Sequence, residues 1–160
     1  MSTVRIVGAL LVLAAVLAGC SSTDAAASGP DADGLEVVRG TPLGEIQAEP
    51  AAGTIKLWVS NQSFGEDPVR LTVRIGDTTV VDDSFEVLGQ HNWIAFDMSG
   101  LAPGSHTLRV VSDTGAEDAM VFDLSATAPK WLLVDYWYDA DEDGERHFTL
   151  RSSDEQILFN

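Results

Sequence analysis

The sequence predicts an all-β domain, folded as a β-sandwich, that follows a short apolar leader. Three observations predict this fold class. Apolar and polar residues alternate with a period of two along several stretches after residue 54, as in strands with one buried face. Glycine or proline separates nearly all of these stretches, at the short spacing of strands joined by turns. After the leader, no stretch repeats its apolar residues with the helical period of about 3.6.

The clearest strand is predicted over residues 69–75, where four apolar residues alternate with three polar ones. Gly76 and Asp77 then form a two-residue turn into a strand over 78–82, because glycine tolerates the positive φ that such a turn requires. Further strands are predicted at 91–98, 105–112, 118–124, 131–138, 146–151 and 156–160.

A strand that begins at residue 55 places Trp58 on one face with Lys56 and Ser60. We expect Trp58 to lie beside Arg70 or Arg74 on a neighbouring strand as a cation–π pair.

Residues 101–110 read Leu-Ala-Pro-Gly-Ser-His-Thr-Leu-Arg-Val. This stretch resembles the corner that enters a late strand of immunoglobulin-like and fibronectin-like domains. Those families often place a tyrosine near the corner to bond back to the chain, and here His106 stands one position early. The resemblance covers ten residues and implies an immunoglobulin-like sandwich rather than a jelly roll.

The leader has one cation, Arg5, followed by an apolar run over residues 6–18 that only a glycine interrupts. This run is shorter than the roughly 20 apolar residues of a membrane-spanning helix, and the layout is that of a signal peptide. Leu17, Ala18, Gly19 and Cys20 follow, and they resemble the lipobox of bacterial lipoprotein precursors. The resemblance implies cleavage before Cys20 and lipidation, with chains such as palmitate, of its thiol. Cys20 is the only cysteine, so no disulfide framework competes for it.

Lipidation predicts a secreted chain that is anchored to the cell membrane or outer membrane and faces the exterior or the periplasm. Several acyl chains anchor stably where one chain binds only marginally. The predicted organisation is a signal peptide over 1–19, the lipidated cysteine and a flexible linker over 20–34, an irregular lead-in over 35–53, and the sandwich over 54–160. The linker is small and polar throughout, and the lead-in contains a short strand at 35–38.

The chain is strongly acidic, with a formal charge of −16 that becomes −17 when Arg5 leaves with the signal peptide. This charge argues against nucleic acid as a partner, because phosphates favour a basic surface. It argues equally against a domain that lies flat on anionic lipid. Calcium, cationic peptides and basic protein patches suit such a field, although a high charge also serves solubility alone.

An acidic run from Asp139 through Asp141 and Asp143 to Gly144 fits the opening of a calcium loop, in which alternate carboxylates converge on one cation. A twelve-residue loop would need a closing glutamate where Leu150 stands. Two interpretations follow: a weak calcium site, or a metal-free acidic hairpin tip.

Four aromatic residues over 131–138 predict a central strand that is apolar on both faces. Trp137, together with Trp58 or Trp93, would form a stacking platform for a sugar or a peptide if these rings were exposed. The alternative is that all three tryptophans belong to the core.

No catalytic motif is present, and the three histidines are far apart in the sequence. The sequence therefore predicts a non-catalytic, lipid-anchored binding module of the cell envelope. No cofactor is predicted, with weakly bound calcium as the alternative, and the predicted partner is another protein, a peptide or a glycan. The alternative function is a calcium-dependent carbohydrate-binding domain.

Overall fold

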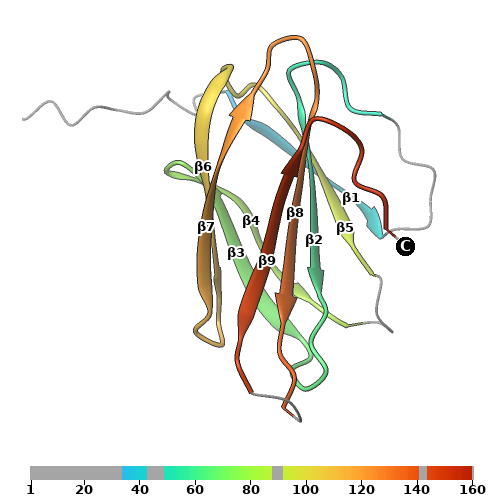
Figure 1. The fold of residues 1–160 in the computed structure, drawn as a ribbon, viewed down its shortest axis with the longest axis vertical. Helices are drawn as coiled ribbons and strands as arrows, with labels where there is room; N and C mark the ends of the chain where they lie inside the picture. Colours follow the sequence, from blue (N-terminus) through green and yellow to red (C-terminus); the bar gives the residue numbers. More distant parts are fainter. Residues whose placement is uncertain (1–33, 43–48, 88–91, 141–143, 160) are drawn as a thin grey trace, which may run out of the picture.

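Two sheets pack face to face in a computed structural model, which describes residues 34–42, 49–87, 92–140 and 144–159 (Figure 1). All regular elements in these ranges are strands: β1 (Glu36–Pro42), β2 (Ile55–Asn61), β3 (Val69–Ile75), β4 (Thr78–Phe85), β5 (Ile94–Ser99), β6 (Gly104–Ser112), β7 (Glu117–Leu124), β8 (Lys130–Trp137) and β9 (His147–Ser153). The predicted all-β sandwich is confirmed.

The larger sheet has the order β1-β5-β2-β8-β9, and the smaller one has the order β4-β3-β6-β7. Neighbouring strands are antiparallel except β2 and β8, which run parallel. Strands β2 to β7 follow the connectivity of strands B, C, C′, E, F and G in immunoglobulin-like sandwiches. Strand β8 lies beside β2 in the place of strand A, and β1 lies beside β5 in the place of strand D.

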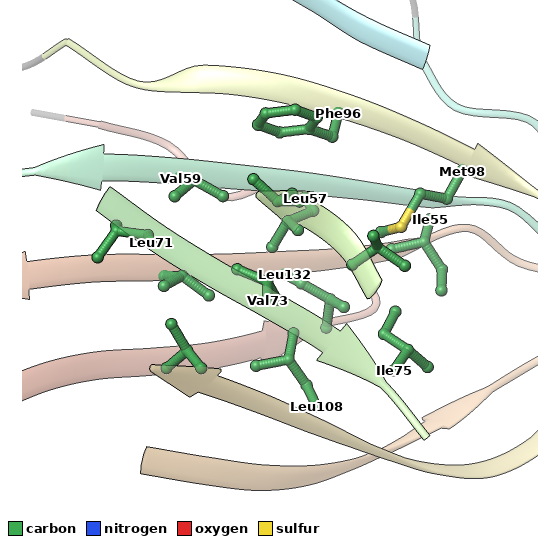
Figure 2. Packing of buried hydrophobic residues seen from close by; sticks show 14 of the residues in the cluster. Ile55, Leu57, Val59, Leu71, Val73, Ile75, Phe96, Met98, Leu108 and Leu132 are labelled. Carbon is green, nitrogen blue, oxygen red and sulfur yellow. The ribbon is translucent and has the colours of Figure 1, made fainter. Parts of the chain in front are cut away.

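The main core lies between the sheets and is built by the apolar side of each strand. Strand β3 buries Val69, Leu71, Val73 and Ile75 while its arginines point outward, as the alternation predicts. Figure 2 shows Leu57 of β2 and Leu132 of β8 facing Val73 across this interior. Alternation thus decides which face of each strand is buried. The burial of these apolar faces is the main driving force for forming the sandwich.

The corner that resembled immunoglobulin-like domains does bond back to the chain. His106 donates from Nε2 to the carbonyl oxygen of Ala102 over 2.8 Å. The imidazole is largely buried and lies next to the ring of Phe122. The hydrogen bond of His106 is therefore made within the fold, to a carbonyl oxygen four residues earlier in the chain.

Three sequence expectations differ from the structure. The sandwich begins before residue 54, because the short strand predicted at 35–38 extends over residues 36–42 as β1 and pairs with β5. Residues 156–159 form no strand but cross the outer face of the larger sheet. Trp58 does not lie beside Arg70 or Arg74, because β2 and β3 belong to different sheets. Its nearby cation is instead Lys56, whose Nζ lies 5.9 Å from the centre of the Trp58 ring.

Candidate functional site

The described chain begins at one end of the sandwich, and the most elaborate loops lie at the other. Glu36 pairs with Ser99, so β1 starts where β5 ends (top of Figure 1). Strand β2 runs away from this end, since Ile55 pairs with Met98 and its last residue, Asn61, pairs with Tyr136. The segments 62–68, 113–116, 138–140 and 144–146 follow or precede strand termini at the far end, which we call the loop end.

Buried polar side chains hold the 62–68 loop in place. Asn61 is fully buried, and its Nδ2 donates to the carbonyl oxygens of Glu66 at 2.9 Å and Phe85 at 3.1 Å. The hydroxyl of Ser63 accepts the backbone N–H of Gly65 at 3.1 Å and of Glu66 at 2.7 Å. Side chains that satisfy backbone groups in this way rigidify a turn. The loop is therefore a fixed surface.

A hydrogen-bonded network joins this loop to two others. The buried Tyr136 donates its hydroxyl to Oε2 of Glu66, and the same hydroxyl lies 2.8 Å from Oγ1 of Thr114 in the β6–β7 turn. Arg146 donates from Nε to Oε1 of Glu66 over 2.8 Å, and its guanidinium lies 4.5 Å from the ring centre of Tyr138. The Glu66 carboxylate and the Tyr136 hydroxyl thus connect the 62–68 loop, the β6–β7 turn and the segment 144–146.

The network also sets the charge of its members. The hydrogen bond from Arg146 lowers the pKa of the Glu66 carboxyl below its ordinary value. Burial, followed by the bond to Glu66, raises the pKa of Tyr136 to about 12. Glu66 is therefore a carboxylate and Tyr136 a neutral donor at neutral pH. This is the charge state that their hydrogen bond requires.

An exposed aromatic ring lies at the rim of this end. Phe64 is 63% exposed, although its backbone N–H is fixed to the carbonyl oxygen of Tyr138 over 2.8 Å. A hollow of about 460 Å³ lies beside it, lined by Ser63, Phe64, Gly65, Glu66, Asp67 and Val87. Aromatic side chains are enriched in protein interfaces, so an exposed ring on a fixed backbone is a candidate contact residue.

The acidic hairpin belongs to the same end. Gly144 donates its N–H to the carbonyl oxygen of Asp139 over 3.1 Å, at a φ of +64° that suits glycine. Asp141 and Asp143 lie outside the described residues. Among the residues that are described, no three histidine, cysteine or carboxylate side chains come together as metal ligands. The calcium site stays a prediction.

The tryptophans of the expected platform are only partly brought together. Trp58 and Trp93 meet on the outer face of the larger sheet, but both are buried there, and Phe159 contacts each of them. Trp137 ends β8 and is half buried, with an indole Nε1 that has no hydrogen-bond partner among the described residues. The rings of Trp58 and Trp93 therefore do not form an open stacking surface while residues 157–159 lie over them.

The expected lipid anchor lies outside the described residues. This holds for Cys20 and for the recognition residues Leu17, Ala18 and Gly19, so the anchor stays a prediction. Within the described ranges, no helix is long and apolar enough to cross a membrane.

No protein-family model matches the chain, and no curated protein matches its sequence. Sequence patterns do not predict the central residues of the loop end, which are Phe64, Glu66, Tyr136 and Arg146. Glu66 and Arg146 are 80 positions apart, and no local pattern reports a contact over that distance. The signal that was available is local turn chemistry: Asn61 and Ser63 are residues that bond to nearby backbone.

Proposed function

We propose that this chain is a lipid-anchored, non-catalytic interaction module of the bacterial cell envelope, which binds its partner through the loop end. The observation that carries the proposal is the placement of this end. The loops with the exposed Phe64 lie at the opposite end of the sandwich from Gly34, which the linker would join to a lipid on Cys20. An anchored chain would hold this end away from the membrane.

The surface chemistry of the loop end supports a protein, peptide or glycan partner. Phe64 provides an apolar anchor, and interfaces commonly surround such anchors with polar groups that exclude water. The rim is acidic, since Asp67 and Asp113 are exposed there and Asp139 is near the hairpin tip. A partner with basic groups at its contact surface would be attracted to this rim.

The test is site-specific photo-crosslinking in the native cells. A photoreactive phenylalanine analogue replaces Phe64 in the membrane-anchored chain, and its adducts are isolated and identified. We expect one dominant adduct at position 64, which weakens when Asp67 and Asp113 are both changed to Asn. The physical reason is that the ring makes the contact and the carboxylates orient a basic partner.

The matched control is Val121 of β7, which is 66% exposed but lies on the outer face of the smaller sheet. The same analogue at position 121 should not give the dominant adduct. Equal adducts at both positions, or none at position 64, would contradict the proposal.

A further inference from the structure

The outer face of the larger sheet carries a second cluster of buried aromatic and apolar side chains, against which Ile157 and Phe159 pack. The sheet contributes Trp58, Trp93, Ala95, Trp131 and Leu133, and we call this set of side chains the tryptophan groove. These side chains come from β2, β8, and β5 with the residue just before it. The groove forms because β5, β2 and β8 are adjacent and each directs such residues outward at alternate positions. It is separate from the loop end.

Residues 154–159, which we call the covering segment, follow β9 (dark red in Figure 1), and Ile157 and Phe159 of this segment pack against the tryptophan groove. The ring of Phe159 stacks on Trp93, with centroids 4.1 Å apart and planes 29° apart. The same ring meets Trp58 edge-on at 5.5 Å. Ile157 is buried in the groove, whereas Leu158 between them is 73% exposed. The segment thus inserts alternate side chains, as an extended peptide does.

Polar contacts fix the start of the covering segment, and the side chains of Ile157 and Phe159 hold its later part on the sheet. Lys130 forms an ion pair with Asp154, and Glu155 donates its N–H to Oγ of Ser153 over 3.0 Å. Beyond this turn, residues 156–159 leave the sheet and form no strand. Contacts with alternate side chains of an extended chain are a usual source of specificity in peptide recognition. The segment occupies the groove as a ligand would.

One polar group in the groove is not used by this occupant. The indole Nε1 of Trp58 is buried and has no hydrogen-bond partner within the described residues, although Trp58 is only 2% exposed. A buried indole N–H normally finds an acceptor. Trp93 shows the usual case, because its Nε1 donates to Asp135 over 2.7 Å. The free donor of Trp58 points to a ligand that brings an acceptor.

We infer that the tryptophan groove is a peptide-binding site, which the covering segment occupies in cis and which accepts in its place an extended peptide of a partner protein. The partner's peptide carries a branched apolar residue two positions before an aromatic one, the pattern of Ile157 and Phe159. The branched residue enters the Ile157 position and the aromatic ring stacks on Trp93. A backbone carbonyl of the incoming peptide accepts the N–H of Trp58.

The test measures whether emptying the groove opens it to a peptide. The probe is a labelled synthetic peptide with the sequence of residues 154–159, titrated by fluorescence anisotropy against the full chain in detergent. Phe159→Ala removes the stacked ring from the groove, and Leu158→Ala is the matched control from the same segment. We expect Phe159→Ala to bind the probe at least about tenfold more tightly than the wild type, and Leu158→Ala to bind like the wild type.

Specificity is tested with a second probe in which the phenylalanine is replaced by serine. This probe should bind Phe159→Ala at least about tenfold more weakly than the first. If a folded Phe159→Ala chain binds the first probe no better than the wild type does, or binds both probes equally, the proposal is overturned.

Circular dichroism checks that Phe159→Ala keeps its sheet spectrum. If the spectrum is lost, Ile157→Ala replaces Phe159→Ala as the test variant, because it leaves the Phe159 stacking in place. Ile157→Ala should bind the first probe more tightly than Leu158→Ala does. A wild-type chain that sediments as a dimer, together with a monomeric Phe159→Ala chain, would overturn the assignment in cis and indicate a second copy as the occupant.

Discussion

Trp93 donates its indole N–H to Oδ1 of Asp135 over 2.7 Å, across 42 positions of sequence. The hydroxyl of Ser60 donates a hydrogen bond to the same oxygen over 2.6 Å. It also accepts a hydrogen bond from Nε2 of Gln62 over 2.9 Å. Asp135 is thus a buried carboxyl at the centre of a series of hydrogen bonds on the outer face of the larger sheet. Such chains hold their members in one arrangement because each bond polarises the next.

The burial of Asp135 predicts a stability that falls as the pH rises. Burial raises the pKa of this carboxyl, while the bonds from Ser60 and Trp93 only partly oppose the rise. Above the ordinary aspartate pKa, the folded chain therefore holds a proton that the unfolded chain has lost, and the free energy of unfolding decreases until the folded pKa is passed. We expect Asp135→Asn to reduce this decrease, as measured by urea unfolding between about pH 4 and pH 7.

The control for Asp135 is Asp82→Asn. A hydrogen bond from Arg70 lowers the pKa of Asp82, so this exposed carboxylate should leave the profile above the ordinary aspartate pKa unchanged and give only a small effect of the opposite sign below it. An unchanged pH profile in Asp135→Asn would contradict the prediction.

The bond between Tyr136 and Glu66 should be measurable as a coupling. Tyr136→Phe removes a buried hydroxyl that bonds to a carboxylate, so we expect a loss of about 1–2 kcal/mol in the free energy of unfolding at neutral pH. The loss should be smaller when Glu66 is already changed to Ala, because the partner is then absent. Urea unfolding of the two single variants and the double variant measures the coupling, and additive losses would refute it.

Acid should weaken the same network. The pKa of Glu66 is lowered in the folded chain, chiefly by the hydrogen bond from Arg146. Its contribution is therefore fully present above the ordinary glutamate pKa and is lost as the pH falls through the folded pKa. We expect Glu66→Gln to flatten the acid limb of the stability profile in urea unfolding. A limb as steep as that of the wild type would assign the acid sensitivity to other carboxylates.

The lipid anchor predicts a dependence on Cys20. Cys20→Ala should release the chain from the membrane fraction or stop it as an uncleaved precursor, because the lipidated thiol is removed. Cell fractionation and the mass of the product measure this outcome, with Ser21→Ala as the control. Membrane retention with normal processing would contradict the anchor.

The acidic hairpin predicts a test with two cations. We expect calcium and magnesium at equal ionic strength to raise the melting temperature equally, since screening of an acidic chain needs no site. A calcium-specific rise that Asp141→Ala abolishes would instead indicate a weak site, with an affinity of about 10⁻⁴ to 10⁻³ M. That result would favour the calcium-dependent carbohydrate-binding alternative.

The sequence by itself determined the fold class and most strands. Alternation and turn residues are local, so β3, the Gly76 turn and β4 could be predicted from neighbouring positions alone. The sequence could not determine that β2 lies parallel to β8, because Ser60 and Asp135 meet across 75 positions. The tertiary structure alone decided that pairing.

The tertiary structure also decided which faces are covered. The alternation in β2 separates two faces, yet every residue of that strand is buried. One face lies against the smaller sheet, and the covering segment lies over Trp58 on the other. Periodicity reports which side chains share a face. What packs on that face depends on contacts between distant segments, here Phe159 on Trp93 and Arg146 on Glu66.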